Sequence, residues 1–225
     1  MNSRKRMVIA IDGPSGAGKS TIARLLAHRL GYTYIDTGAL YRAVGWKVTK
    51  EQLDPGNESA LAELCERVDV ALRYDDGVQR VSVDGTDVTE QIRTPEMGMK
   101  ASAVSKSSAV RARLLSIQRA MGEQGGVVMD GRDIGTVVFP NADVKFFLDA
   151  SADERGRRRW KELRDKGLDV DLAAITGEIK ARDDQDSKRD IAPLRKADDA
   201  FYVDSSAMTI DEVVNRLMGK VAEKS

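Results

Sequence analysis

Short apolar runs separated by helical patterns organise most of the sequence. Residues 7–11 form a continuous apolar run with β-branched side chains, which is typical of a strand buried on both faces of a parallel sheet. Four further runs, at 32–35, 127–129, 144–148 and 201–203, predict four more strands. Because helical patterns lie between these runs, we expect an α/β fold with a doubly wound, parallel five-stranded core sheet.

Several helices of this core carry start and stop signals. Residues 22–30 have apolar positions at helical spacing, and Gly31 provides a stop directly after them. Residues 42–48 favour a second helix. Thr209 and Glu212 have the spacing of a capping box, so the last helix is expected to begin there.

One segment departs from this alternation. Residues 68–74 have apolar side chains at every second position, and two shorter runs follow, each after an Asp-Gly pair. Asp-Gly pairs between alternating runs are typical of tight hairpin turns, so the pattern predicts a small three-stranded antiparallel sheet. We interpret residues 60–95 as an insert and residues 1–59 and 96–225 as the core. A helix is expected to follow at Thr94-Pro95, with threonine as the cap.

Charge and composition exclude some classes of partner. The 225 residues are 41% apolar and include 36 basic and 36 acidic side chains, giving a net charge of zero. Bulk attraction to nucleic acid or to an anionic membrane is therefore not expected. No stretch is long enough to span a bilayer, and the apolar run at 7–11 is too short for the core of a signal peptide. We expect a cytoplasmic protein, and nothing in the sequence requires more than a monomer.

The residues that most often bind transition metals are scarce. Cys65 is the only cysteine and lies in an apolar helical pattern, so we interpret it as a small buried hydrophobic residue. His28 is the only histidine. A built-in transition-metal site is therefore not expected.

A phosphate-binding loop follows the first predicted strand. Residues 13–20 read Gly-Pro-Ser-Gly-Ala-Gly-Lys-Ser and fit the pattern G-x-x-x-x-G-K-[ST], between a buried strand and an amphipathic helix. Backbone N–H groups of such a loop point at phosphate oxygens, Lys19 reaches the β and γ phosphates, and Ser20 ligates Mg²⁺. The predicted ATP-binding residues are Gly13, Pro14, Ser15, Gly16, Ala17, Gly18, Lys19, Ser20 and Thr21.

The loop does not by itself decide what happens to the nucleotide. A guanine-reading Asn-Lys-x-Asp motif is absent from the sequence, which argues against a GTPase switch but leaves an ATPase or a nucleotide-dependent binding module open.

Arginines at the ends of predicted strands indicate a binding site for a second anion. Arg42 and Arg132 each follow a predicted strand, and the segment 182–189, before the last predicted strand, contains further arginines. The carboxyl ends of parallel strands line the binding crevice, and guanidinium groups suit bidentate phosphate contacts. The alternative is that these arginines form surface ion pairs.

A further arginine cluster, Arg155-Gly-Arg157-Arg158-Arg159, opens a helix whose expected cap is Ser151. Such a run is usually a solvated face. The functional alternative is a helical lid, at about 151–190, that brings an arginine to the ATP phosphates.

Taken together, the motifs resemble those of the bacterial cytidylate kinases. The resemblance rests on the phosphate loop, on Asp-Thr-Gly-Ala-Leu-Tyr-Arg at 36–42, on Ile-Arg-Thr at 92–94, on Asp-Gly-Arg-Asp-Ile-Gly-Thr-Val-Val-Phe-Pro at 130–140 and on Arg-Asp-Asp-Gln-Asp-Ser-Lys-Arg at 182–189. It covers nearly the whole chain. It implies a P-loop core with a nucleoside-monophosphate-binding insert and a lid, and transfer of the ATP γ-phosphoryl group to CMP, with dCMP as a second acceptor.

The resemblance also implies roles for individual residues. Arg42, Arg132 and Arg189 would hold the acceptor phosphate, and Ser102, Arg111 and Asp133 would bind the cytosine edge. Thr37 and Tyr41 would line the pyrimidine pocket, and Arg182 and Asp186 would contact the ribose hydroxyls. Lys19, Arg132 and Arg158 would be catalytic, with Arg158 and then Arg159 as the lid residues that meet ATP. Cytosine has an amino donor at N4 and acceptors at N3 and O2, which suits a carboxylate beside an arginine and a hydroxyl. A kinase acting on UMP, or on a small acid such as shikimate, is the nearest alternative.

Overall fold

The computed structural model describes residues 6–75 and 78–224. These residues divide into two compact units. The first contains the described residues up to Tyr34 together with those from Gln124 onward, and the second is Ile35–Glu123.

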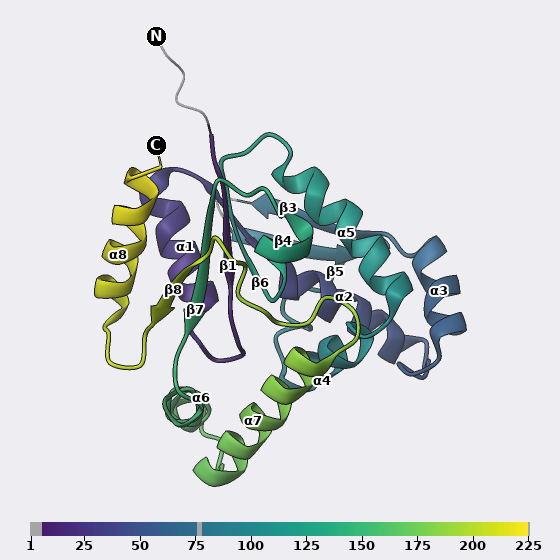
Figure 1. Ribbon diagram of the computed structural model, residues 1–225. Helices are drawn as coiled ribbons and strands as arrows, with labels where there is room; N and C mark the ends of the chain where they lie inside the picture. Colours follow the sequence, from purple (N-terminus) through teal and green to yellow (C-terminus); the bar gives the residue numbers. More distant parts are fainter. Residues whose placement is uncertain (1–5, 76–77, 225) are drawn as a thin grey trace. The chain divides into compact units, whose positions relative to one another are not determined.

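A parallel sheet of five strands has the order β2-β6-β1-β7-β8. Figure 1 labels four of them, β6, β1, β7 and β8. Its members are β1 (Val8–Asp12), β2 (Thr33–Asp36), β6 (Val127–Gly131), β7 (Val144–Asp149) and β8 (Phe201–Asp204). Strand β1 pairs in parallel with both β6 and β7, and β7 pairs in parallel with β8. All five predicted strands are confirmed. Because β1 lies in the middle, the loops that follow β1, β6 and β7 leave the sheet at neighbouring positions on the same edge.

The core of the first unit is the apolar layer between the sheet and two helices, α1 (Lys19–Leu30) and α8 (Ile210–Ala222) (Figure 1). Ile9 and Phe146 from the sheet are fully buried against Leu26 of α1 and Leu217 of α8. The predicted ends of both helices are confirmed: α1 stops at Gly31 in a left-handed conformation, and α8 begins with a complete capping box.

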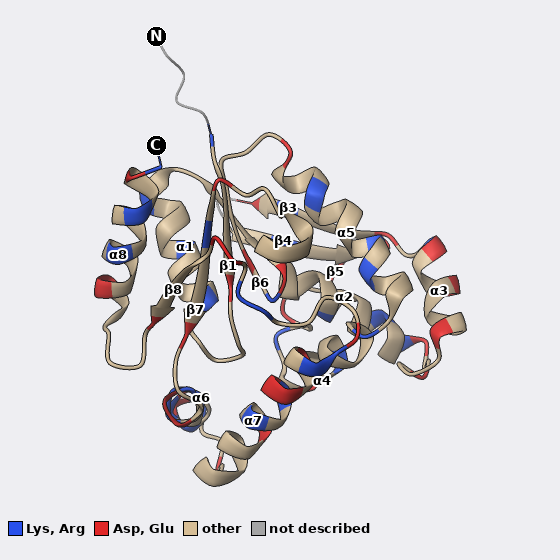
Figure 2. Ribbon diagram, viewed as in Figure 1, with Lys and Arg blue, Asp and Glu red and all other residues tan. Residues whose placement is uncertain are grey.

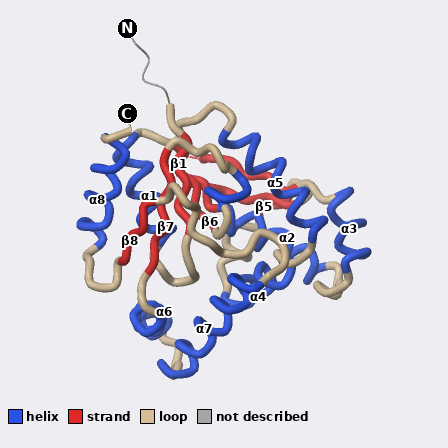
Figure 3. Tube along the Cα trace, in the orientation of Figure 1, coloured by secondary structure: helices blue, strands red, loops and turns tan. Residues whose placement is uncertain are grey.

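Two further helices of the first unit, α6 (Ala152–Asp165) and α7 (Leu172–Lys188), pack against each other (Figure 3). Leu163, Ile175 and Ile179 form a small apolar cluster between them, and the indole of Trp160 donates to the carbonyl of Val170 at 3.0 Å. Ser151 caps α6 as predicted. The segment predicted as a lid is thus largely helical, while its movement stays a prediction.

The second unit contains a separate antiparallel sheet, β3-β4-β5, as the alternating pattern predicts. Its strands are β3 (Val70–Asp75), β4 (Val78–Val83) and β5 (Thr86–Asp87), and its helices are α2 (Thr37–Lys50), α3 (Glu58–Arg67), α4 (Pro95–Val104) and α5 (Ser108–Gly122). The second Asp-Gly pair forms the expected turn, with positive φ at Asp84 and Gly85. The first pair, at 76–77, lies outside the described residues.

This unit is wider than the predicted insert at 60–95, because α2, α4 and α5 share one apolar core with the sheet. Leu40 and Val44 of α2, Val104 of α4 and Leu114 of α5 are buried in the same cluster as Val81 of β4. The boundaries of the insert as a domain that moves separately stay a prediction. Cys65 is also buried in this cluster, as predicted. Within the part of the chain that the structure describes, no helix is both long and apolar enough to cross a bilayer.

A network of ion pairs ties three elements of the second unit together. Lys47 of α2 contacts Glu51 at 3.0 Å and Asp84, in the β4–β5 turn, at 2.6 Å. Glu51 also accepts two hydrogen bonds from Arg67 at the end of α3. The hydrogen bonds from Arg67, and then from Lys47, lower the pKa of Glu51 to about 2. The ionised form of this carboxylate is therefore the form that the folded unit favours.

We predict that Glu51→Gln lowers the free energy of unfolding by about 1 kcal/mol at neutral pH. Since the folded-state pKa of Glu51 is below its ordinary value of 4.5, its contribution is complete above about pH 4.5 and is lost as pH falls toward 2. Urea unfolding of the wild type and of Glu51→Gln should show that the difference in their free energies of unfolding disappears across this pH range. Glu66→Gln, at an exposed position of α3 next to Arg67, is the control and should leave stability unchanged. A gap independent of pH would contradict the role of the charge.

Candidate active site

The loop after β1 has the curled backbone that phosphate binding requires. Gly13 has a φ of 151°, and a Cβ there would lie 1.9 Å from the carbonyl oxygen of Leu148 in β7. Gly16 and Gly18 have φ values of 79° and 86°, in the left-handed region that favours glycine. Helix α1 begins directly after the loop, so its free N–H groups face the same place.

Lys19 is held inside this loop. Its ammonium donates to the carbonyl of Pro14 at 2.7 Å, and the residue is buried. Burial, and next the positive charge of Arg132, lower the pKa of Lys19 to about 7, although Asp130, Asp12 and Asp186 act in the opposite direction. Strands β1 and β6 are neighbours in the sheet, with Asp12 paired to Gly131. The loop that leads to Lys19 and the segment that begins with Arg132 therefore leave the sheet side by side.

Ser20 faces a carboxylate at the end of β6. Its hydroxyl donates to Asp130 Oδ2 at 2.9 Å, and the hydroxyl of Tyr34 donates to the other oxygen, Oδ1, at 3.0 Å. Hydroxyl and carboxylate oxygens are the hard ligands that Mg²⁺ prefers. Within the described residues, no group of three or more histidine, cysteine or acidic side chains could hold a metal by itself. A cation here would need oxygens from the nucleotide as well.

A buried carboxylate at the end of β1 fixes the segment after β6. Asp12 accepts hydrogen bonds from the N–H groups of Ile134 at 2.8 Å and Gly135 at 2.7 Å, at the start of a short π-helical turn, η1 (Ile134–Val138). Burial raises the pKa of Asp12 to about 7, against the lowering effect of these two bonds. Asp12 cannot be identified from the sequence alone, because its partners lie 122 and 123 residues further along the chain.

Helix α7 places three predicted residues beside the segment after β6. Asp186 accepts from Arg132 Nε at 2.8 Å, and Arg189 lies 3.9 Å from Asp133. Burial works against ionisation of Asp186, but Arg132, then Arg182 and Arg189, hold its pKa below the usual value. Five predicted substrate-binding residues are thus brought together: Arg132, Asp133, Arg182, Asp186 and Arg189.

The arginines of α6 differ in what they contact, although Figure 2 shows charges of both signs all around this helix. Arg158 donates to the carbonyl and hydroxyl of Ser205, and a Cβ on Gly18 would lie 3.9 Å from its Nη1. Arg159 pairs with Glu162 on its own helix, and Arg157 pairs with Glu154. Of the two predicted lid arginines, Arg158 is therefore the one at the phosphate loop.

The remaining predicted residues, Thr37, Tyr41, Arg42, Ser102 and Arg111, belong to the second unit. Thr37 and Tyr41 lie one turn apart on α2, and the guanidinium of Arg111 in α5 lies 5.8 Å over the Tyr41 ring. Arg42 pairs with Asp36 at 2.8 Å, and its buried Nε finds no hydrogen-bond partner among the described residues. Ser102 is half-buried on α4, which packs against α2.

Comparison with known proteins agrees with the site's chemistry. The sequence model of one family, described as cytidylate kinase, matches residues 9–223. The chain is 51% identical to a cytidylate kinase of Geobacter sulfurreducens over 98% of this chain and 95% of that protein. It is 48% identical to a cytidylate kinase of Bacillus subtilis (strain 168), covering 98% of this chain and 99% of that protein.

Solved structures are similar to this chain in fold alone. An uncharacterised protein from Eubacterium ventriosum has a TM-score of 0.52 and 11% identity, covering 96% of this chain and 99% of its own. A gluconokinase from Sinorhizobium meliloti has a TM-score of 0.50 and 15% identity, covering 98% of this chain and 94% of its own.

We predict that binding of tripolyphosphate at pH 8 takes up protons. Free Lys19 is largely neutral there because its pKa is about 7, and bound phosphates raise that pKa. Titration calorimetry should give a binding enthalpy that becomes more endothermic as the ionisation enthalpy of the buffer increases, with a weaker dependence near pH 6. Lys19→Arg is the control, because arginine stays charged and takes up no proton. The same enthalpy in every buffer would contradict the lowered pKa.

Proposed function

The chain belongs to the cytidylate kinase family and is an enzyme that phosphorylates CMP with ATP, and from this premise we propose which of its residues carry out the transfer. We propose further that dCMP is a second acceptor. The observation on which the assignment chiefly depends is the pairing of β1 with β6, which starts the loop to Lys19 beside Arg132, itself paired with the buried Asp186.

ATP binds through its phosphates at the loop of residues 13–21. The curled backbone offers N–H groups, and Lys19 exchanges the carbonyl of Pro14 for the β and γ phosphates. Arg158, close to Gly18, neutralises charge on the transferred group. Thr21 begins α1 with Lys19 and Ser20, where the helix N-terminus favours an anion.

Mg²⁺ fits the oxygen ligands at the end of β6. Ser20 would hold it directly, and Asp130, which accepts from Ser20, would orient the cation's water ligands. When bound, the cation supplies charge neutralisation between the β and γ phosphates.

The acceptor phosphate is held by arginines. Arg132 and Arg189 are two of them, and Arg42, with its unsatisfied Nε, is the third. Asp186 and Arg182 hold the ribose hydroxyls. An oxygen of the CMP phosphate attacks the γ phosphorus, the bond from that phosphorus to the β–γ bridging oxygen breaks, and ADP leaves. Because the attacking oxygen is already ionised at neutral pH, no general base is needed, and the arginines offset the repulsion between the two phosphates.

The cytosine base is recognised by its hydrogen-bonding edge. Asp133 accepts from the N4 amino group, Ser102 and Arg111 donate to N3 and O2, and Thr37 and Tyr41 contact the ring. Uracil has a carbonyl at C4, so an ionised Asp133 would face it without a proton between them. The cytoplasmic location and the monomeric state stay predictions.

A coupled assay of ADP formation tests the function. With ATP and Mg²⁺, we expect rapid turnover with CMP, turnover with dCMP, slower turnover with UMP and none with AMP or shikimate. An ATPase or a nucleotide-dependent binding module would form ADP at one slow rate whether or not an acceptor is present. Acceptor-independent ADP formation would therefore exclude the transfer reaction.

We predict that Asp133→Asn reduces the preference for CMP over UMP on the order of 10-fold, because the new amide can donate to the uracil carbonyl. The ratio of kcat/KM values for the two acceptors measures this change. Asp184→Asn is the control, since Asp184 is exposed on α7 and pairs with Lys188. An unchanged ratio in an active Asp133→Asn enzyme would remove Asp133 from base recognition.

A further inference from the structure

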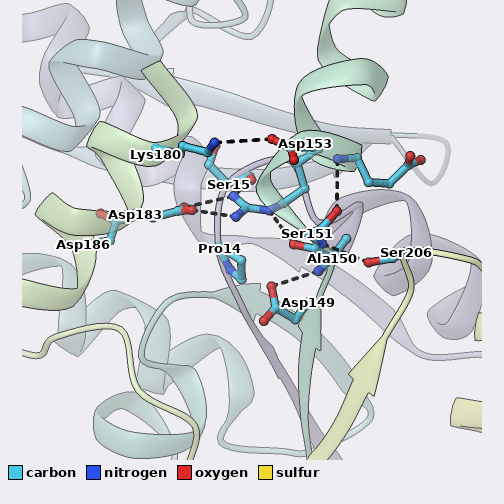
Figure 4. A network of polar contacts seen from close by, with 12 residues as sticks. Pro14, Ser15, Asp149, Ala150, Ser151, Asp153, Lys180, Asp183, Asp186 and Ser206 are labelled. Carbon is cyan, nitrogen blue, oxygen red and sulfur yellow. Dashed lines mark hydrogen bonds and ion pairs between the residues drawn. The ribbon is translucent and has the colours of Figure 1, made fainter. Parts of the chain in front are cut away.

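Arg155 is the one arginine of the α6 cluster whose side chain is buried; only 5% of it is exposed. Its Nε donates to the carbonyl of Ala150 at 2.8 Å, and its Nη1 donates to the carbonyl of Ser15 in the phosphate loop at 3.0 Å. Nη1 and Nη2 also donate to the two carboxylate oxygens of Asp183 on α7, at 3.0 and 2.6 Å. Figure 4 labels these three partners, Ser15, Ala150 and Asp183, in the network of polar contacts. One side chain therefore joins the loop, the end of β7 and helix α7.

The bond to Ser15 has a consequence for the next peptide N–H. The peptide between Ser15 and Gly16 is planar and trans, so its N–H points away from its C=O. Because the Ser15 carbonyl accepts from Arg155, the Gly16 N–H of the same trans peptide points away from Arg155. A Cβ on Gly16 would lie 3.2 Å from the Cβ of Arg155, so the arginine stem also packs beside this glycine.

Gly16 needs this support because glycine has little conformational preference of its own. With a φ of 79°, it is in a region that it leaves at little cost. A flip of the Ser15–Gly16 peptide would replace a donor by a carbonyl oxygen on the side where phosphates bind. Charge-assisted hydrogen bonds from a planar guanidinium oppose such a flip more strongly than neutral bonds do.

We propose that Arg155 is a positioning residue that holds the Ser15–Gly16 peptide with its N–H toward the ATP phosphates, and that Asp183 is the residue that holds Arg155. Arg155 acts through the loop and does not itself touch the nucleotide. This role rests on the proposed function of the loop as the ATP site.

The spacing on α7 extends the same role. Asp183 binds Arg155, and Asp186, three residues later, binds Arg132. Residues three apart lie on one face of a helix. One turn of α7 therefore contacts both Arg155, which binds the phosphate loop, and Arg132, which is proposed to bind the acceptor phosphate.

The test compares Arg155→Lys with Arg157→Lys in the full-length protein. Lysine keeps the charge but lacks the planar fork that reaches three acceptors. Arg157 is the matched control: it lies two residues away on α6, is 66% exposed, and pairs only with Glu154 in the contacts seen. For each protein, calorimetry gives Kd for ATP and for tripolyphosphate, steady-state kinetics give KM for ATP and for CMP, and thermal unfolding gives Tm.

We expect Arg155→Lys to raise Kd for both ATP and tripolyphosphate about 10-fold, with KM for CMP changed by less than about 2-fold. Arg157→Lys should match the wild type. A lower Tm with unchanged Kd values would overturn the proposal, because Arg155 would then only stabilise the packing of α6 on α7.

A second variant covers the case in which Arg155→Lys does not fold. Asp183→Asn keeps one oxygen for Arg155, and we expect weaker ATP binding than in the wild type; equal affinity would overturn the proposal. These binding measurements need no acceptor. If the wild-type protein failed to phosphorylate CMP, the proposed function would be lost, while the effect of Arg155 on phosphate binding would still be measured.

Discussion

Crowding of positive charge in a buried place is the constraint on which this structure depends. A site for two phosphate groups needs several cations close together, and those cations repel one another when the phosphates are absent. The protein meets this constraint with carboxylates: Asp186 beside Arg132, Asp183 beside Arg155, and Asp12 and Asp130 near Lys19. Removing one partner of such a buried pair is costly because the other charge stays buried without compensation.

The same pairing shows how a chain with no net charge can still gather cations at one place. The cations are concentrated locally and are balanced locally, so the long-range field that attracts nucleic acid is not needed. In the proposed function, phosphates would replace carboxylates or carbonyls as partners, as at Lys19, which donates to the carbonyl of Pro14. Binding would then exchange one set of polar contacts for another.

Much of the fold could be predicted from the sequence because its signals are local. A strand buried on both faces must be apolar throughout, and a capping box involves residues only three apart. The predicted helix at 42–48 was too short. Helix α2 begins at Thr37, because Asp36, directly after the predicted strand at 32–35, caps the helix by accepting from the N–H of Ala39. The width of the second unit was missed because it depends on which helices share a core.

The candidate site was predicted in part, since motif residues are visible in the sequence and their partners are not. Arg155 lies in a run of arginines. Its helical spacing from Ala152 and Leu163, which lie on the packed side of α6, is the sequence signal that distinguishes it from the exposed Arg157. Its partners Ser15 and Asp183 lie 140 and 28 residues away. Contacts of that range depend on how the chain folds back on itself.

The two carboxylates of α7 also have a thermodynamic consequence. A helix is stiff over a single turn, so a displacement that separated Asp186 from Arg132 would also move Asp183 relative to Arg155. If the two ends of this turn serve the two substrates as proposed, occupancy at one end would change the affinity at the other, and by linkage the change would be reciprocal. The two substrates of the enzyme would in that case bind with heterotropic cooperativity carried by one helical turn.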